Sequence, residues 1–177
     1  MRRLTLLWLL TLLSALTVAV EAQTSSHVDT LVLTATRSYQ TAGRGGQAVL
    51  LAGEIVVPAN QDATLTTVDL TLPQATVDAV DVVDAYLTAE ADNEFFAQSR
   101  APFASSAAAH ALTLTGQASL AAGTTCRLWV VAKVKDDAPV GSSLSVAVTG
   151  LSYKDAAGDV PKEKGLRGNP KGKVKGF

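Results

Sequence analysis

The sequence has few of the side chains that make cross-links, metal sites and aromatic binding surfaces. Its only cysteine, Cys126, excludes an internal disulfide. The two histidines, His27 and His110, have no cysteine or carboxylate at the spacing of a zinc site, so no metal is expected. Aromatic residues make up 5% of the 177 residues, which predicts a core built from Ala, Val and Leu.

Catalytic and phosphate-binding motifs are missing too. No Gly-x-Ser-x-Gly elbow occurs. The glycine-rich run 42–46 lacks the strand-to-helix context of a phosphate loop. Asp78, Asp81 and Asp84 recur every third residue, unlike the one-three-five pattern of a calcium loop, which favours a solvated face. We therefore expect no catalytic residue, no cofactor, no metal and no enzymatic activity in this chain.

Charge is distributed unevenly, although the formal net charge is only −1. Residues 23–160 carry 7 basic and 14 acidic side chains, whereas residues 161–177 carry 6 basic and one acidic. The acidic body argues against nucleic acid as a partner. The basic stretch mixes Lys, Gly and Pro and predicts a disordered tail or linker. Two roles stay open for it: a solvated connector, or electrostatic contact with an anionic envelope surface.

The long apolar run of the chain lies at its N-terminus. Arg2 and Arg3 precede uncharged residues from Leu4 to Val20, and small residues flank Glu21. This order is typical of a secretory signal peptide over residues 1–22, with a retained signal anchor as the alternative. We expect a secreted, periplasmic or cell-surface protein.

The rest of the chain alternates apolar and polar residues with period two. The stretch from Leu112 to Tyr153 is the clearest, with turn residues at Ala121-Ala122-Gly123 and at 136–141 between its strands. Val49 and Leu51 share one parity of an earlier strand. Seven strands are expected, near residues 31–35, 49–57, 66–72, 82–89, 110–115, 126–134 and 143–151.

This pattern predicts an all-β fold. We expect a single antiparallel β-sandwich of immunoglobulin-like or jelly-roll type over residues 23–160, with a closed barrel as the alternative. A hairpin turn is expected at Lys154–Asp159. Phe95, Phe96 and Phe103 lie in a less regular segment and are expected to plug one end of the core.

The strand at 126–134 contains the candidate binding residues. Trp129 falls on the parity opposite the aliphatic face, together with Arg127 and Lys133. An outward Trp beside an Arg is typical of interface anchors, so these three residues predict contact with a glycan or a neighbouring domain. The alternative is that sheet curvature or the Phe-rich segment covers Trp129. Cys126 has the aliphatic parity and is expected to be a buried, inert thiol.

A series of short motifs between residues 68 and 153 resembles a known family. The motifs are Ala85-Tyr86-Leu87, Asn93-Glu94-Phe95-Phe96, Ala101-Pro102-Phe103, residues 116–123 (GQASLAAG), Leu128-Trp129-Val130 and residues 138–144 (APVGSSL). Their order resembles that in the N-terminal accessory domain found ahead of the β-propeller in bacterial exo-α-sialidases, the BNR-repeat neuraminidases. The resemblance implies a β-sandwich that works beside a sialidase propeller.

The same resemblance indicates what the chain would lack as an enzyme. Such sialidases use a Tyr nucleophile, a Glu, an Asp acid/base and three Arg residues, all on a propeller of several blades. The 17 residues after Val160 are too few for one blade, and the motif Ser-x-Asp-x-Gly-x-Thr-Trp does not occur.

Three functions follow as expectations. The first is a non-catalytic exported module that assists recognition of sialosides or positions a β-propeller sialidase. The second is an N-terminal fragment of an exo-α-sialidase whose propeller is missing. The third is a structural or adhesion protein of the cell envelope. The sequence leaves the ligand and the oligomeric state open.

Overall fold

The computed structural model describes residues 32–36, 42–59, 62–89, 101–155, 158–160 and 171–174. The expected signal peptide, His27, Phe95, Phe96 and most of the basic C-terminal stretch lie outside the described residues. The one described helix has six residues, and no helix in the described ranges has the length and hydropathy to cross a bilayer.

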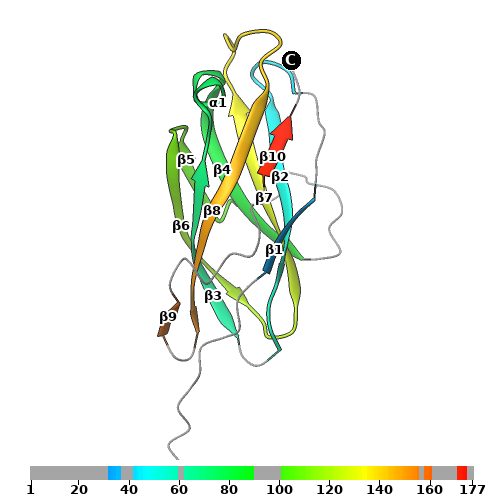
Figure 1. The fold of residues 1–177 in the computed structure, drawn as a ribbon, viewed down its shortest axis with the longest axis vertical. Coiled ribbons are helices and arrows are strands. Elements are labelled where there is room, and N and C mark those ends of the chain that lie inside the picture. The colour runs from blue at the N-terminus through cyan, green and yellow to red at the C-terminus, as the bar shows by residue number, and fades with distance from the viewer. Residues whose placement is uncertain are drawn as a thin grey trace, which may run out of the picture.

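Two antiparallel sheets lie face to face in an elongated sandwich (Figure 1). Sheet A has the order β1 (Val32–Thr36), β2 (Gln47–Val56), β7 (Thr125–Val134), β4 (Val80–Ala89) and β5 (Ala104–Ala107). Sheet B has the order β10 (Lys171–Val174), β8 (Leu144–Asp155), β3 (Ala63–Thr71) and β6 (Ala111–Leu120), and β9 (Gly158–Val160) also pairs with β8. The predicted all-β sandwich is confirmed, and all seven expected strands are present. The strands form two separate sheets, so the alternative of a closed barrel does not apply.

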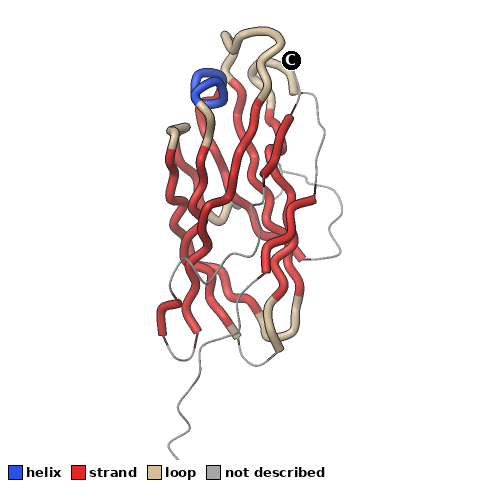
Figure 2. The backbone as a smooth tube through the Cα atoms, viewed as in Figure 1, coloured by secondary structure: helices blue, strands red, loops and turns tan. Residues whose placement is uncertain are grey.

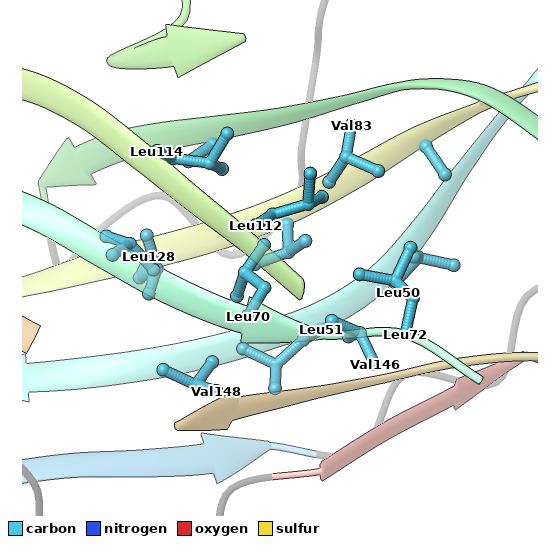
Figure 3. Packing of buried hydrophobic residues seen from close by; sticks show 14 of the residues in the cluster. Leu50, Leu51, Leu70, Leu72, Val83, Leu112, Leu114, Leu128, Val146 and Val148 are labelled. Carbon is cyan, nitrogen blue, oxygen red and sulfur yellow. The ribbon is translucent and has the colours of Figure 1, made fainter. Parts of the chain in front are cut away.

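Aliphatic side chains from both sheets fill the space between them, as the composition predicts. Figure 3 shows Leu50, Leu51, Leu70, Leu72, Val83, Leu112, Leu114, Leu128, Val146 and Val148 in this core. Burying one such side chain stabilises the fold by about 1.5–3 kcal/mol. Phe103 is partly buried and packs against the core. Its backbone oxygen and ring lie so close to Gly116 that a Cβ there would collide with them.

A bulge in β2 changes which side chains face the core. The register with β7 shifts between Val49 and Leu51, so Leu50 is an extra residue in the strand. Leu50 and Leu51 both lie in the core, whereas Val49 belongs to a different cluster on the other side of sheet A. The prediction that Val49 and Leu51 share a face is therefore wrong, because one inserted residue reverses the alternation.

Helix α1 (Gln74–Ala79) is an element that the sequence did not predict. It starts directly after Pro73, whose extended backbone ends β3 and introduces the first turn. The Gln74 amide donates a hydrogen bond to the Asp78 carboxylate, one helical turn later, at 2.8 Å. Six residues are too few to display a period of 3.6, which explains why the pattern is invisible in the sequence.

Two side chains connect α1 to the strands. Thr76 is fully buried, and its hydroxyl donates to the Ser145 carbonyl at 3.2 Å and accepts from the Ser145 amide at 3.0 Å. The pairing of β8 with β3 ends at Ala147. The Thr76 hydroxyl therefore provides hydrogen-bond partners for backbone groups of β8 that β3 does not reach. The Lys135 ammonium donates to the carbonyls of Val77 and Asp78, near the C-terminal end of α1, where carbonyls lack helical partners. Figure 2 shows α1 at one end of the sandwich.

The C-terminal part of the chain contains both a confirmed prediction and a correction. β8 and β9 form the hairpin expected at Lys154–Asp159, with Gly158 at a φ of 119°. The expectation of a disordered tail over residues 161–177 is wrong for Lys171–Val174, since this segment forms β10 and pairs with residues 144–147 of β8. Pairing at a sheet edge requires only backbone groups, so a segment without hydrophobic alternation can still add a strand.

Candidate functional site

Strand β7 places the three predicted contact residues on the face of sheet A that points away from the core. Leu128 and Val130 lie in the core, whereas Trp129 between them lies in a second cluster. Arg127 and Lys133 share the parity of Trp129. The prediction that Trp129 lies opposite the core face is thus confirmed.

The second cluster, here the outer-face cluster, is apolar and well buried. Its members are at most 7% exposed: Val49, Ala52, Tyr86, Trp129 and Val131. Strand pairing places these residues together, because Trp129 lies opposite Ala52 on β2 and Tyr86 on β4. The Trp129 indole nitrogen donates a hydrogen bond to the Thr88 hydroxyl at 2.9 Å, which satisfies the one polar atom of the ring.

The burial of Trp129 limits what it can do. The residue is 5% exposed, whereas a sugar ring that stacks on an indole needs an accessible face. In this conformation Trp129 stabilises sheet A, and a ligand would reach it only after neighbouring groups moved. The alternative in which the ring is covered is therefore the arrangement found in the structure.

Charged groups lie around the outer-face cluster. Arg127 donates to the Glu54 carboxylate on β2 at 3.2 Å, and the two side chains are 19% and 34% exposed. Lys133 is exposed near the opposite end of β7. Val56, at the end of β2, is an apolar residue with 44% of its surface exposed. Of the three predicted residues, Lys133 is thus the most accessible to a partner.

Two ionisable groups of sheet A, one in this cluster and one on the core side, have raised pKa values that favour their neutral forms. Burial raises the pKa of the Tyr86 phenol, and the Asp84 carboxylate raises it further through its charge and a hydrogen bond. Burial also raises the pKa of the Cys126 thiol from 9.0 to about 11. Cys126 packs against the core but is half-buried rather than fully buried, so the expectation of a buried thiol holds in part. Its raised pKa leaves little thiolate at neutral pH, in agreement with the expected inertness.

The other residues considered from the sequence have local structural roles. The His110 Nδ1 lies 2.7 Å from the carbonyl oxygen of Leu72, and the Leu72 amide donates to the His110 carbonyl. The glycine-rich run leads into β2, and Arg44 within it donates to the Ala138 carbonyl at 2.7 Å. In the described ranges no three His, Cys, Asp or Glu side chains converge as a metal site.

The sequence missed two features of this site. Alternation places Tyr86 on the same face of β4 as Asp84 and Thr88, and these polar neighbours give no sign that Tyr86 is buried. Alternation also predicts Val49 in the core, whereas it lies in the outer-face cluster. The unbroken apolar run Ala48–Ala52 interrupts the alternation and is the signal in the sequence that indicates a bulge. The partners of Trp129 come from β2 and β4, so only strand pairing could identify them.

Comparison with known proteins bears on the fold. No family model and no curated protein matches the sequence. The structure is similar to part of the Hadza microbial sialidase Hz136, with a TM-score of 0.52 and 12% sequence identity over 77% of this chain and 31% of that chain. This chain therefore spans less than a third of the sialidase. At this identity the likeness supports the β-sandwich fold alone.

Two other solved structures have lower scores. The B domain of a biofilm-associated protein has a TM-score of 0.41 and 10% identity over 82% of this chain and 41% of that chain. The sixth cohesin of scaffoldin B from Acetivibrio cellulolyticus has a TM-score of 0.39 and 13% identity over 86% of this chain and all of that chain. Scores below 0.5 carry no argument about function.

Proposed function

We propose that the protein is a non-catalytic, exported β-sandwich module that assists a β-propeller sialidase, by positioning it or by helping it to recognise sialosides. The observation that carries this proposal is the similarity of the sandwich to part of a sialidase chain. The motif order over residues 68–153 supports the same assignment independently, because it depends on the sequence and not on the similarity of the folds. In this role the sandwich is a rigid support, and the chemistry belongs to its partner.

The outer face of sheet A is the surface that we assign to the partner domain. Lys133 is exposed, Val56 is an accessible apolar residue, and Arg127 is fixed by Glu54 at 3.2 Å. An Arg held by an ion pair and an exposed Lys can donate hydrogen bonds to carbonyls or carboxylates of a partner. Trp129 is buried beneath this surface and stabilises it. A structural role of this kind explains why Trp129 can belong to the motif series although its ring is not exposed.

The experiment mixes the full exported chain with a purified bacterial exo-α-sialidase. We expect the chain to bind the sialidase or a sialylated mucin, to raise the kcat/KM of the sialidase on that mucin, and to release no sialic acid alone. Release of sialic acid by the chain alone would overturn the non-catalytic assignment. An absence of binding to both the sialidase and the mucin would overturn the accessory role and favour the envelope or adhesion protein.

Matched variants locate the contact. Lys133→Gln and Arg127→Gln remove charge from the outer face of sheet A, and we expect each to weaken binding several-fold. Gln117→Ala changes an exposed residue on β6 in the other sheet and serves as the control. If all three variants bind equally, the contact does not use the outer face of sheet A.

A further inference from the structure

Figure 1 shows that β3 begins, and β6 and β8 end, at the end of the sandwich opposite α1. Residues at these strand ends line a groove. Its volume is about 760 Å³, within the range of about 300–1,000 Å³ that small-molecule sites occupy. Its polar lining residues are Asp62, Thr64, Ser119, Lys154 and Asp155, and Ala63 and Leu120 contribute apolar surface. The candidate contact residues Trp129, Arg127 and Lys133 play no part in this groove, whereas Ser119, Leu120 and Ala121 belong to the motif at residues 116–123.

Strand register places three of the polar side chains in one row. Lys154 pairs with Thr64, and Thr64 pairs with Ser119, so the row crosses β8, β3 and β6. Residues directly opposite one another point to the same face and have Cβ atoms about 5 Å apart, so the row is about 10 Å long. An ammonium and two hydroxyls therefore line one wall at a spacing that can meet more than one sugar ring.

Asp62 is held in position at the edge of this row. One of its carboxylate oxygens accepts a hydrogen bond from the Ala122 amide at 2.8 Å. This bond connects the start of β3 to the turn after β6, where Gly123 adopts a φ of 70°. A carboxylate fixed in this way presents its remaining lone pairs in a constant direction and loses little freedom when a ligand binds.

The lining chemistry selects the class of ligand. Carboxylates accept hydrogen bonds from hydroxyl groups, whereas the ammonium donates and the Thr64 and Ser119 hydroxyls do both. Two carboxylates and one ammonium leave the groove with a negative balance, and residues 23–160 are acidic as a whole. An anionic ligand such as sialic acid would be repelled, while a neutral polyhydroxylated ligand meets donors and acceptors without electrostatic cost.

We propose that this groove binds a neutral saccharide rather than an anionic one. This inference goes beyond the proposed function, because it assigns a ligand to the chain itself and requires no catalytic partner. None of the described residues that line the groove is aromatic, so these residues provide no stacking contribution and the Kd should be millimolar.

The test titrates the full exported chain with lactose and, separately, with sialyllactose, and follows backbone amide signals by NMR. We expect lactose to shift the signals of Thr64, Ser119 and Lys154 in a saturable way, and sialyllactose to bind several-fold more weakly. Lactose without effect would overturn the proposal. Equal or tighter binding of sialyllactose would overturn the neutral-ligand assignment.

Variants separate the groove from the rest of the sheet. Ser119→Ala and Thr64→Ala should each lower lactose affinity several-fold, and Asp62→Asn, which keeps an acceptor for the Ala122 amide, should do the same. Gln117→Ala, on the same outward side of β6 but outside the lining, should bind lactose normally. Circular dichroism confirms that each variant is folded. If calcium chloride alone reproduces the lactose shifts, the groove is a cation site and the proposal fails.

Discussion

The outer faces of the two sheets differ although both sheets have the same antiparallel pairing. On sheet A, the outer-face cluster buries Trp129, Tyr86 and Val131 in addition to the core below them. On sheet B, the outward residues of β6 are exposed: Ala111, Thr113, Thr115, Gln117 and Ser119. The outer face of sheet A is thus buried at its centre, with Lys133 and Val56 exposed at its margins, whereas the outer face of sheet B is exposed along β6.

This difference shows how strand composition reports on the environment of each face. β6 alternates between exposed positions and buried or half-buried ones, which is the pattern of a sheet that faces water on one side. β7 is buried without interruption from Leu128 to Ala132, which is the pattern of a strand that is covered on both sides. The apolar character of Val131 and Trp129 is therefore a structural requirement of β7.

The polar face of sheet B has its own contacts. The Thr113 hydroxyl donates to the Asp69 carboxylate at 2.6 Å across β6 and β3. Asp69 also lies close to Gly150 on β8, where an added Cβ would approach the carboxylate to 2.8 Å. These short side chains and the glycine give the outer face of sheet B a polar character, whereas the outer-face cluster of sheet A is apolar.

Truncation of the outer-face cluster should have the largest effect. Trp129→Ala removes a buried ring and its hydrogen bond to Thr88, and we expect the free energy of unfolding to fall by about 3–5 kcal/mol. Thr115→Ala, on the exposed face of sheet B, should change it by less than about 0.5 kcal/mol. Urea denaturation of both variants makes the comparison. Equal losses would mean that the two outer faces contribute alike.

The thiol on the inner side of β7 should make stability depend on alkaline pH. Because the folded pKa of Cys126 is raised from 9.0 to about 11, its contribution is complete below pH 9 and is lost as pH rises toward 11. Relative to Cys126→Ala, the wild type should lose about 2 kcal/mol over this interval. Urea denaturation at a series of pH values measures the difference, in which other titrating groups cancel. A constant difference would contradict the buried position of the thiol.

The ion pair beside the outer-face cluster should have the smallest effect. Both Arg127 and Glu54 keep some solvent contact, so their coupling should be about 0.2–1 kcal/mol and should weaken at high salt. A double-mutant cycle with Arg127→Ala and Glu54→Ala measures it. A coupling that is larger and independent of salt would show that the pair is shielded as completely as Trp129.

Much of the fold could be predicted because most strands carry their own signal. The alternation in 126–134 and the turn at Ala121–Gly123 both correspond to elements of the structure. Helix α1 and β10 could not be found in this way. α1 depends on the contacts that Thr76 and Lys135 make with distant residues, and β10 depends on the free edge of β8.

The candidate sites divide along the same line. The parity of Trp129, Arg127 and Lys133 could be read directly, since side chains alternate along a strand. The burial of Trp129 could not, because its neighbours Ala52 and Tyr86 come from strands 77 and 43 residues away in the chain. The groove was invisible for the same reason, since Thr64, Ser119 and Lys154 meet only through strand register.

The sequence by itself determined the all-β class, the positions of the main strands and the faces on which most side chains lie, because alternation is a local property of an extended backbone. The tertiary structure alone decided which strands pair, where the bulge in β2 reverses the alternation, that Trp129 is buried, and that a polar groove forms at one end. These features depend on register between distant segments, and register is fixed by packing and hydrogen bonding across the sheets rather than within any one strand.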